Sequence, residues 1–204
     1  MPIKATSSFE PLDQWFSSDA QFNQLYPQGI EALAQRHWTP LQVAWKAAQF
    51  LATEKDAKIL DIGSGVGKFC LVGAYYRPEA FYYGVEQRKN MIGHAERAKD
   101  LLQLGNVSFI HGNFTSLDLR QFNHFFFYNS FFENLADAST TIDNNIVYSG
   151  ELFDYYNRYL YKQLEQTPSG TKLATFHSLE DEVPSCFKVV DADLEGELKF
   201  WMKA

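Results

Sequence analysis

The chain has 204 residues, 46% of them hydrophobic and 21% charged, which predicts a soluble globular protein with one compact core. A formal net charge of -7 disfavours a phosphate-binding surface, so we expect no nucleic-acid partner. Residues 1–10 contain no apolar stretch long enough for a signal peptide or a membrane helix, and we expect a cytoplasmic protein without membrane association.

The first 57 residues are expected to form a helical extension packed on the rest of the chain. Thr39 and Pro40 predict a helix start, with the hydroxyl as N-cap and proline at the first helical position. An earlier short helix is expected around Tyr26–Gln35. The apolar stripe of the main helix consists of Leu41, Ala44, Ala48 and Leu51.

From residue 58 to residue 204, short apolar runs alternate with helical segments, which predicts an α/β fold with a parallel sheet between helices. Strands are expected at Lys58–Ile62, Ala80–Val85, Val107–His111, Phe125–Tyr128, Leu173–Phe176, Phe187–Val190 and Glu197–Met202, and helices at Lys68–Tyr76, Gln87–Leu104 and Gly150–Gln166. The linker Asp191–Gly196 permits a hairpin but no parallel crossover. The pattern therefore predicts a three-layer α/β/α sandwich, with a seven-stranded, mostly parallel sheet that ends in an antiparallel hairpin.

The strongest local pattern is an acid followed by alternate glycines directly after the first strand, at Asp61, Gly63, Gly65 and Gly67. A backbone that turns sharply against a ligand cannot carry Cβ atoms, and a helix start offers unpaired amide groups. A phosphate-binding P-loop is excluded because Phe69 follows Lys68, and the dinucleotide pattern G-x-G-x-x-G would need glycine at position 68. The pattern resembles motif I of S-adenosylmethionine-dependent methyltransferases.

Two further elements follow the next two strands. Glu86 ends the second strand, where a carboxylate can accept hydrogen bonds from both hydroxyls of a ribose. Asn113 and Phe114 follow the third strand, where an amide and a ring can border an adenine. Because the carboxyl ends of parallel strands share one edge of the sheet, these elements are expected to converge on one crevice.

Over residues 40–204 the chain resembles a class I methyltransferase, and its cofactor motifs are most similar to the non-SET histone lysine methyltransferases of the disruptor-of-telomeric-silencing family. The resemblance implies a Rossmann-like fold and S-adenosyl-L-methionine as cofactor. It covers the cofactor pocket, and such pockets do not disclose the acceptor. The implied cofactor-binding residues are Asp61, Gly63, Ser64, Gly65, Gly67, Glu86, Asn113, Phe114 and Asn129.

The fourth strand ends at Tyr128-Asn129-Ser130, which is similar to the N-P-P-[YF] motif of methyltransferases that act on amino nitrogens. The resemblance implies that Asn129 accepts a hydrogen bond from the target nitrogen, and Ser130 in place of proline is expected to loosen the turn. Tyr128 and Asn129 are the expected catalytic residues. No residue stands out as a base, although His111 or Tyr128 could assist.

Several alternatives remain open at the level of sequence. Residues 125–127, all phenylalanine, also suit a strand buried on both faces, and residues 37–39 suit either a cofactor border or a capped helix. His94, His124 and His177 lack metal-ligand spacing, so no metal is expected. The favoured function is N-methylation of a protein side chain or a small amine. The alternatives are a catalytically silent cofactor-binding scaffold or sensor and a nicotinamide oxidoreductase, which Lys68 disfavours.

Overall fold

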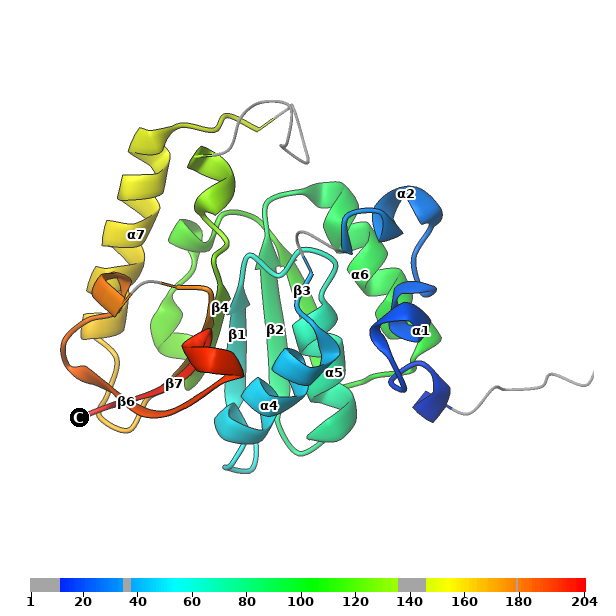
Figure 1. Ribbon diagram of the computed structural model, residues 1–204, viewed down its shortest axis with the longest axis horizontal. Coiled ribbons are helices and arrows are strands. Elements are labelled where there is room, and N and C mark those ends of the chain that lie inside the picture. Colours follow the sequence, from blue (N-terminus) through cyan, green and yellow to red (C-terminus); the bar gives the residue numbers. More distant parts are fainter. Residues whose placement is uncertain (1–11, 35–37, 136–145, 179) are drawn as a thin grey trace, which may run out of the picture.

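A seven-stranded sheet lies at the centre of the computed structural model, which describes residues 12–34, 38–135, 146–178 and 180–204 (Figure 1). Its strand order is β3-β2-β1-β4-β5-β7-β6. The strands are β1 (Lys58–Ile62), β2 (Phe81–Glu86), β3 (Val107–His111), β4 (His124–Tyr128), β5 (Lys172–Phe176), β6 (Phe187–Asp193) and β7 (Leu198–Lys203).

Strands β1 to β5 pair in parallel, whereas β7 runs antiparallel to both β5 and β6. A single 3-10 turn, η6 (Leu194–Gly196), joins the last two strands, and all three of its residues have positive φ. The predicted α/β fold, with a mostly parallel sheet and a C-terminal hairpin, is confirmed. Strand β6 extends three residues beyond the predicted end, so the hairpin loop is tighter than expected.

Helices cover both faces of the sheet because alternate strand residues point to opposite sides. Ile59 and Phe126 belong to the core beneath α4 (Leu41–Leu51), α5 (Lys68–Tyr76) and α6 (Lys89–Leu101). Leu60 and Phe125 belong to a second core beneath α7 (Gly150–Glu165). Ser149 caps α7, because its side chain accepts a hydrogen bond from the Leu152 amide.

The N-terminal segments pack on the α4 and α5 side of the molecule. They comprise the 3-10 turn η1 (Leu12–Gln14) and the short helices α1 (Asp19–Asn23) and α2 (Gln28–Glu31). Phe22 is fully buried in the same core as α4 and α5, and the buried Tyr26 hydroxyl donates to the Val66 carbonyl at 3.0 Å. This contact joins the N-terminal segments to the glycine-rich loop.

Several predicted helix boundaries differ from the structure, including the end of α6, which lies at Leu101 instead of Leu104. Thr39 is not the cap of α4: Pro40 occupies the N-cap position with an extended backbone, and the Asp19 carboxylate caps the Leu41 amide at 3.0 Å. The helix expected around Tyr26–Gln35 is the single turn α2, and Gln35 itself lies outside the described residues. Helix α6 begins two residues later than predicted, because Arg88 takes an extended conformation before it.

Four further 3-10 turns connect the main elements: η2 (Phe114–Ser116), η3 (Leu119–Gln121), η4 (Phe132–Leu135) and η5 (Glu180–Glu182). Turns η2 and η4 directly follow β3 and β4, at the edge where the carboxyl ends of the parallel strands meet. Within the described ranges, no helix has the length and apolarity needed to cross a bilayer.

Candidate active site

The glycine-rich loop between β1 and α5 turns through three left-handed glycines. Gly63, Gly65 and Gly67 have φ of +77°, +54° and +81°. A Cβ on Gly63 would lie 2.4 Å from Cβ of Ser130, and one on Gly67 would lie 2.4 Å from the Phe109 ring, so packing requires glycine at both positions. A Cβ on Gly65 would meet nothing within 4 Å. Gly65 therefore presents bare backbone to open space, as a ligand-binding loop requires.

Two neighbouring cavities lie at the carboxyl edge of the sheet and contain all but one of the predicted site residues. The larger measures about 530 Å³ and the smaller about 40 Å³. Asp61, Gly63, Ser64, Gly65, Tyr128 and Asn129 line the larger cavity, and Gly63, Glu86, Asn113 and Phe114 line the smaller one. Gly67 lines neither and instead occupies the N-cap position of α5.

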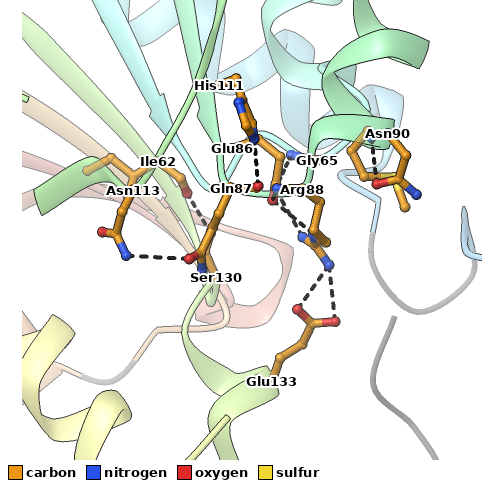
Figure 2. A network of polar contacts seen from close by, with 11 residues as sticks. Ile62, Gly65, Glu86, Gln87, Arg88, Asn90, His111, Asn113, Ser130 and Glu133 are labelled. Carbon is orange, nitrogen blue, oxygen red and sulfur yellow. Dashed lines mark hydrogen bonds and ion pairs between the residues drawn. The ribbon is translucent and has the colours of Figure 1, made fainter. Parts of the chain in front are cut away.

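Glu86 ends β2 and is almost completely buried, with 2% of its surface exposed. Its Oε2 accepts a hydrogen bond from the Gly65 amide at 3.0 Å, which joins the carboxylate to the glycine-rich loop (Figure 2). The Arg88 guanidinium donates to both carboxylate oxygens, from Nε to Oε1 at 2.8 Å and from Nη2 to Oε2 at 3.0 Å. Both oxygens of the predicted ribose acid therefore already have a cationic partner.

Arg88 also donates through Nη1 to the Glu133 carboxylate, at 3.0 and 3.2 Å (Figure 2). Burial alone would lower the pKa of Arg88. The hydrogen bonds to Glu86 and the charge of Glu86 outweigh this effect and raise the pKa above its ordinary value, so the guanidinium stays charged. Arg88 and Glu133 each line both cavities. The ion pair between Arg88, at the start of α6, and Glu133 in η4 therefore borders both cavities.

Asn113 and Phe114 lie beside Glu86, but both already have partners in the protein. The Asn113 side-chain oxygen caps η2 by accepting from the Thr115 amide at 3.0 Å, and its nitrogen donates to the Tyr156 hydroxyl at 2.8 Å. The Phe114 ring is buried and stacks on Phe131, with ring centroids 5.0 Å apart. The structure thus places both residues at the predicted strand end, in a tightly packed part of the site.

The turn after β4 is held by the residue that replaces the proline of the related motif. The Ser130 hydroxyl donates to the Ile62 carbonyl at the end of β1, at 2.5 Å (Figure 2). Asn129 has φ of +40°, and its carbonyl accepts from the Phe132 amide at 3.1 Å. The Ser130 hydroxyl thus ties this turn to the neighbouring strand, a contact that opposes the loosening expected from the loss of proline.

Two buried ionisable groups lie in the larger cavity near the loop. Burial, reinforced by the charge of Glu86, raises the pKa of Asp61 to about 8, although the Cys70 thiol donates to this carboxylate at 3.7 Å. Burial lowers the pKa of Lys68, whose ammonium nonetheless pairs with Asp19 at 2.5 Å. The buried Ser64 hydroxyl has no hydrogen-bond partner among the described residues. A polar ligand would satisfy this group.

Some residues of the site were not predicted from sequence. Arg88, Glu133, Lys68 and His177 line the larger cavity, and none was assigned to the site from the pattern. Arg88 lies two positions after Glu86, but the predicted helix start at Gln87 gave no indication that Arg88 is extended and reaches Glu86. Trp38 and Thr39 also line the larger cavity, as expected if residues 37–39 border the cofactor. His37 lies outside the described residues.

Comparisons with known proteins agree with this geometry. Residues 53–149 match a family described as methyltransferase domain. The release factor glutamine methyltransferase of Buchnera aphidicola subsp. Baizongia pistaciae (strain Bp) is 36% identical over 66 residues, which is 32% of this chain and 24% of that protein. The chain therefore spans about a quarter of the length of this curated relative.

Solved methyltransferase structures share the fold. The RNA methyltransferase from Salinibacter ruber, in complex with S-adenosyl-L-homocysteine, superposes with a TM-score of 0.57 at 19% identity, over 82% of this chain and 93% of that one. Precorrin-6y C5,15-methyltransferase from Geobacter metallireducens GS-15 gives a TM-score of 0.55 at 13% identity, over 84% and 92% of the two chains. The fold is therefore the Rossmann-like fold of class I methyltransferases.

The matched family, the curated relative and these solved neighbours are all described as methyltransferases, and the Salinibacter ruber structure contains S-adenosyl-L-homocysteine. The names of these proteins specify different acceptors: RNA, a glutamine and a precorrin. The comparisons therefore leave the acceptor open, and they do not support the exclusion of nucleic acid that the net charge suggested.

The raised pKa of Asp61 predicts a pH-dependent stability. Between the unfolded value of 3.8 and the folded value of about 8, Asp61 is protonated when folded and ionised when unfolded. The contribution of Asp61 to the free energy of unfolding is fully present below the unfolded pKa, and it is lost as the pH rises toward the folded pKa. We expect wild type to lose stability relative to Asp61→Asn by about 1 kcal/mol per pH unit between pH 5 and 8. Urea unfolding at four pH values checks this, and parallel pH profiles for the two proteins would contradict it.

Proposed function

We propose that this chain binds S-adenosylmethionine at the carboxyl edge of its sheet and transfers the methyl group to a nitrogen of a protein side chain or a small amine. One observation carries the proposal: the Gly65 backbone and the Glu86 carboxylate, from two neighbouring strand ends, are joined by a hydrogen bond beside a cavity that also contains Asn129. In the proposal, the groups that would bind the cofactor therefore lie close to the group that would bind the acceptor.

The residues around the cavities fit the parts of this cofactor. Glu86 would accept hydrogen bonds from the ribose hydroxyls, and Asn113 and Phe114 would border the adenine. The bare backbone at Gly65 would face the rest of the cofactor, as would the Ser64 hydroxyl, which has no partner among the described residues. The bound cofactor supplies a methyl group already activated by a positively charged sulfur. The protein therefore contributes chiefly by binding and alignment.

Cofactor binding requires Arg88 to leave Glu86. The guanidinium occupies both carboxylate oxygens, and a ribose diol needs the same two acceptors. Displacement of Arg88 would also open the boundary between the two cavities, since Arg88 and Glu133 line both. We therefore propose that the contacts of Arg88 with Glu86 define a closed arrangement, in which the guanidinium takes the place of the ribose.

The end of β4 supports a nitrogen acceptor. In the proposal, the Asn129 side-chain oxygen accepts a hydrogen bond from the incoming nitrogen and orients its lone pair, while Tyr128 forms part of the wall. The local likeness to a release factor glutamine methyltransferase supports a side-chain nitrogen as the target. The histone-enzyme resemblance rests on the cofactor motifs alone and does not extend to the acceptor.

Glu86→Gln tests the proposed cofactor site. The variant keeps the shape of the side chain but loses the charge, so it should weaken binding of S-adenosylhomocysteine at least about tenfold, as expected for charge-assisted hydrogen bonds. Titration calorimetry measures this. Glu96→Gln on α6, where Glu96 pairs with Lys99 away from the cavities, is the matched control and should bind like wild type. Failure of the wild-type chain to bind either the cofactor or its product would refute the proposal.

A methylation assay with the wild-type protein distinguishes an active enzyme from a catalytically silent scaffold or sensor. The purified chain is incubated with methyl-labelled cofactor and, in turn, a glutamine-containing peptide, a lysine-containing peptide, RNA and a cell extract. Labelled peptide or protein is the expected result. Tight cofactor binding without any labelled product would favour the scaffold or sensor, and labelled RNA alone would replace the proposed acceptor.

Arg88→Met tests the closed conformation. Removing the guanidinium leaves Glu86 buried without its cationic partner, which should lower the free energy of unfolding by about 3 kcal/mol. It also frees one acceptor position on each oxygen, since Oε1 keeps the Arg88 amide and Oε2 keeps the Gly65 amide. We therefore expect the affinity for S-adenosylhomocysteine to rise about tenfold, with a larger ligand-induced increase in Tm than in wild type. Calorimetry and thermal unfolding measure both effects. Arg97→Met is the control, since Arg97 lies within α6, lines neither cavity and donates to the Gly93 carbonyl. Weaker binding by Arg88→Met would show instead that Arg88 stabilises the bound state.

A further inference from the structure

His177 lies beside the proposed acceptor-binding residue because of the strand order. Strands β4 and β5 are parallel neighbours, and Tyr128 pairs with Phe176 at their carboxyl ends. Asn129 follows Tyr128 and His177 follows Phe176, so the two residues lie side by side just beyond the carboxyl ends of these strands. Both have positive φ, +40° and +54°, and both line the larger cavity.

The His177 imidazole is held in place by a carboxylate from the adjoining strand end. Its Nδ1 lies 2.5 Å from Oε2 of Glu197, just before β7, and the His177 amide donates to the Glu197 carbonyl at 3.0 Å. The ring packs against Phe176 and Tyr128, with centroid distances of 3.9 and 5.7 Å. Because a carboxylate only accepts hydrogen bonds, Nδ1 carries a proton, and in the neutral ring Nε2 therefore has the lone pair.

A nitrogen acceptor must lose a proton during methylation, and the proposed function so far assigns no group to take it. We infer that His177 is the general base of the reaction and that Glu197 is its positioning residue, an inference that rests on the proposed function. A histidine oriented by a carboxylate on Nδ1 is suited to accept a proton at Nε2. The acceptor is thereby specified as a nitrogen that still carries a removable proton.

The step balances in atoms and charge. The nitrogen lone pair forms the new N–C bond, and the electron pair of the broken S–C bond stays on sulfur. One N–H proton passes to Nε2 of His177, and Glu197 stabilises the resulting imidazolium. His177 then releases the proton to solvent, because 44% of its side chain is exposed.

The other ionisable groups of the cavity are less suited to this role. Burial raises the pKa of the Tyr128 hydroxyl, and the Tyr128 ring packs against the imidazole from β4. The Lys68 ammonium pairs with Asp19, and the Arg88 guanidinium with Glu86 and Glu133. Asp61 bonds to the Cys70 thiol beneath the glycine loop. Of the groups that line the cavity in the described residues, His177 combines solvent access with a carboxylate on one ring nitrogen.

The test uses two cofactor analogues, so it needs no identified acceptor. In both analogues, nitrogen replaces the sulfur of the cofactor. In one, a 2-aminoethyl group on this nitrogen takes the place of the methyl group and extends beyond it, and in the other a propyl group of the same length does so. Wild type should bind the amino analogue at least about tenfold more tightly, because the amine donates to Asn129 and His177. In His177→Asn this preference should fall about tenfold. Binding of S-adenosylhomocysteine should stay within about twofold of wild type, since no group of that ligand is expected at Nε2.

Asparagine is chosen because it tolerates the left-handed backbone of His177 but is too short to replace Nε2. Glu197→Gln keeps His177 in place and should reduce the preference about threefold, so it decides the test if His177→Asn does not fold. His94→Asn on α6 is the matched control and should behave like wild type. An unchanged preference in the His177 and Glu197 variants would overturn the inference while the cofactor site stands. No binding of S-adenosylhomocysteine by wild type would instead overturn the proposed function, and this inference with it.

Discussion

The site is organised around one buried carboxylate, that of Glu86, which needs partners on both oxygens because an unpaired buried charge is strongly destabilising. The Gly65 amide supplies one fixed partner, and this hydrogen bond sets the glycine-rich loop against the end of β2. Arg88 supplies the exchangeable partners. The demand of Glu86 for partners therefore explains both the affinity we propose for a ribose diol and the closed arrangement around Arg88.

Much of the fold follows from local sequence patterns. Alternating apolar runs and helical segments place every strand to within a few residues, and the short link before β7 predicts the antiparallel hairpin. Gly65 and Glu86 could be predicted as neighbours because a parallel sheet brings successive strand ends to one edge. The boundaries were less accurate where tertiary contacts decide them: Asp19, far away in sequence, caps α4 in place of Thr39.

The groups that sequence did not assign depend on three-dimensional adjacency. The helical pattern extended α6 back to Gln87, which concealed the extended Arg88 that reaches Glu86. His177 lacks metal-ligand spacing and appeared ordinary, because its nearness to Asn129 follows from the pairing of β4 with β5 rather than from any motif. Ser130 departs from the related motif, yet its hydroxyl fixes the turn to Ile62, a contact that the one-letter pattern cannot reveal.

Glu86 is proposed to exchange an internal guanidinium for the ribose of the cofactor. A crystal structure of the chain with S-adenosylhomocysteine would show this exchange. We expect both ribose hydroxyls within about 2.6–3.2 Å of the Glu86 oxygens, with the Arg88 guanidinium withdrawn from them. A bound ligand that leaves the Glu86–Arg88 pair intact, and whose ribose lies elsewhere, would contradict the proposed exchange.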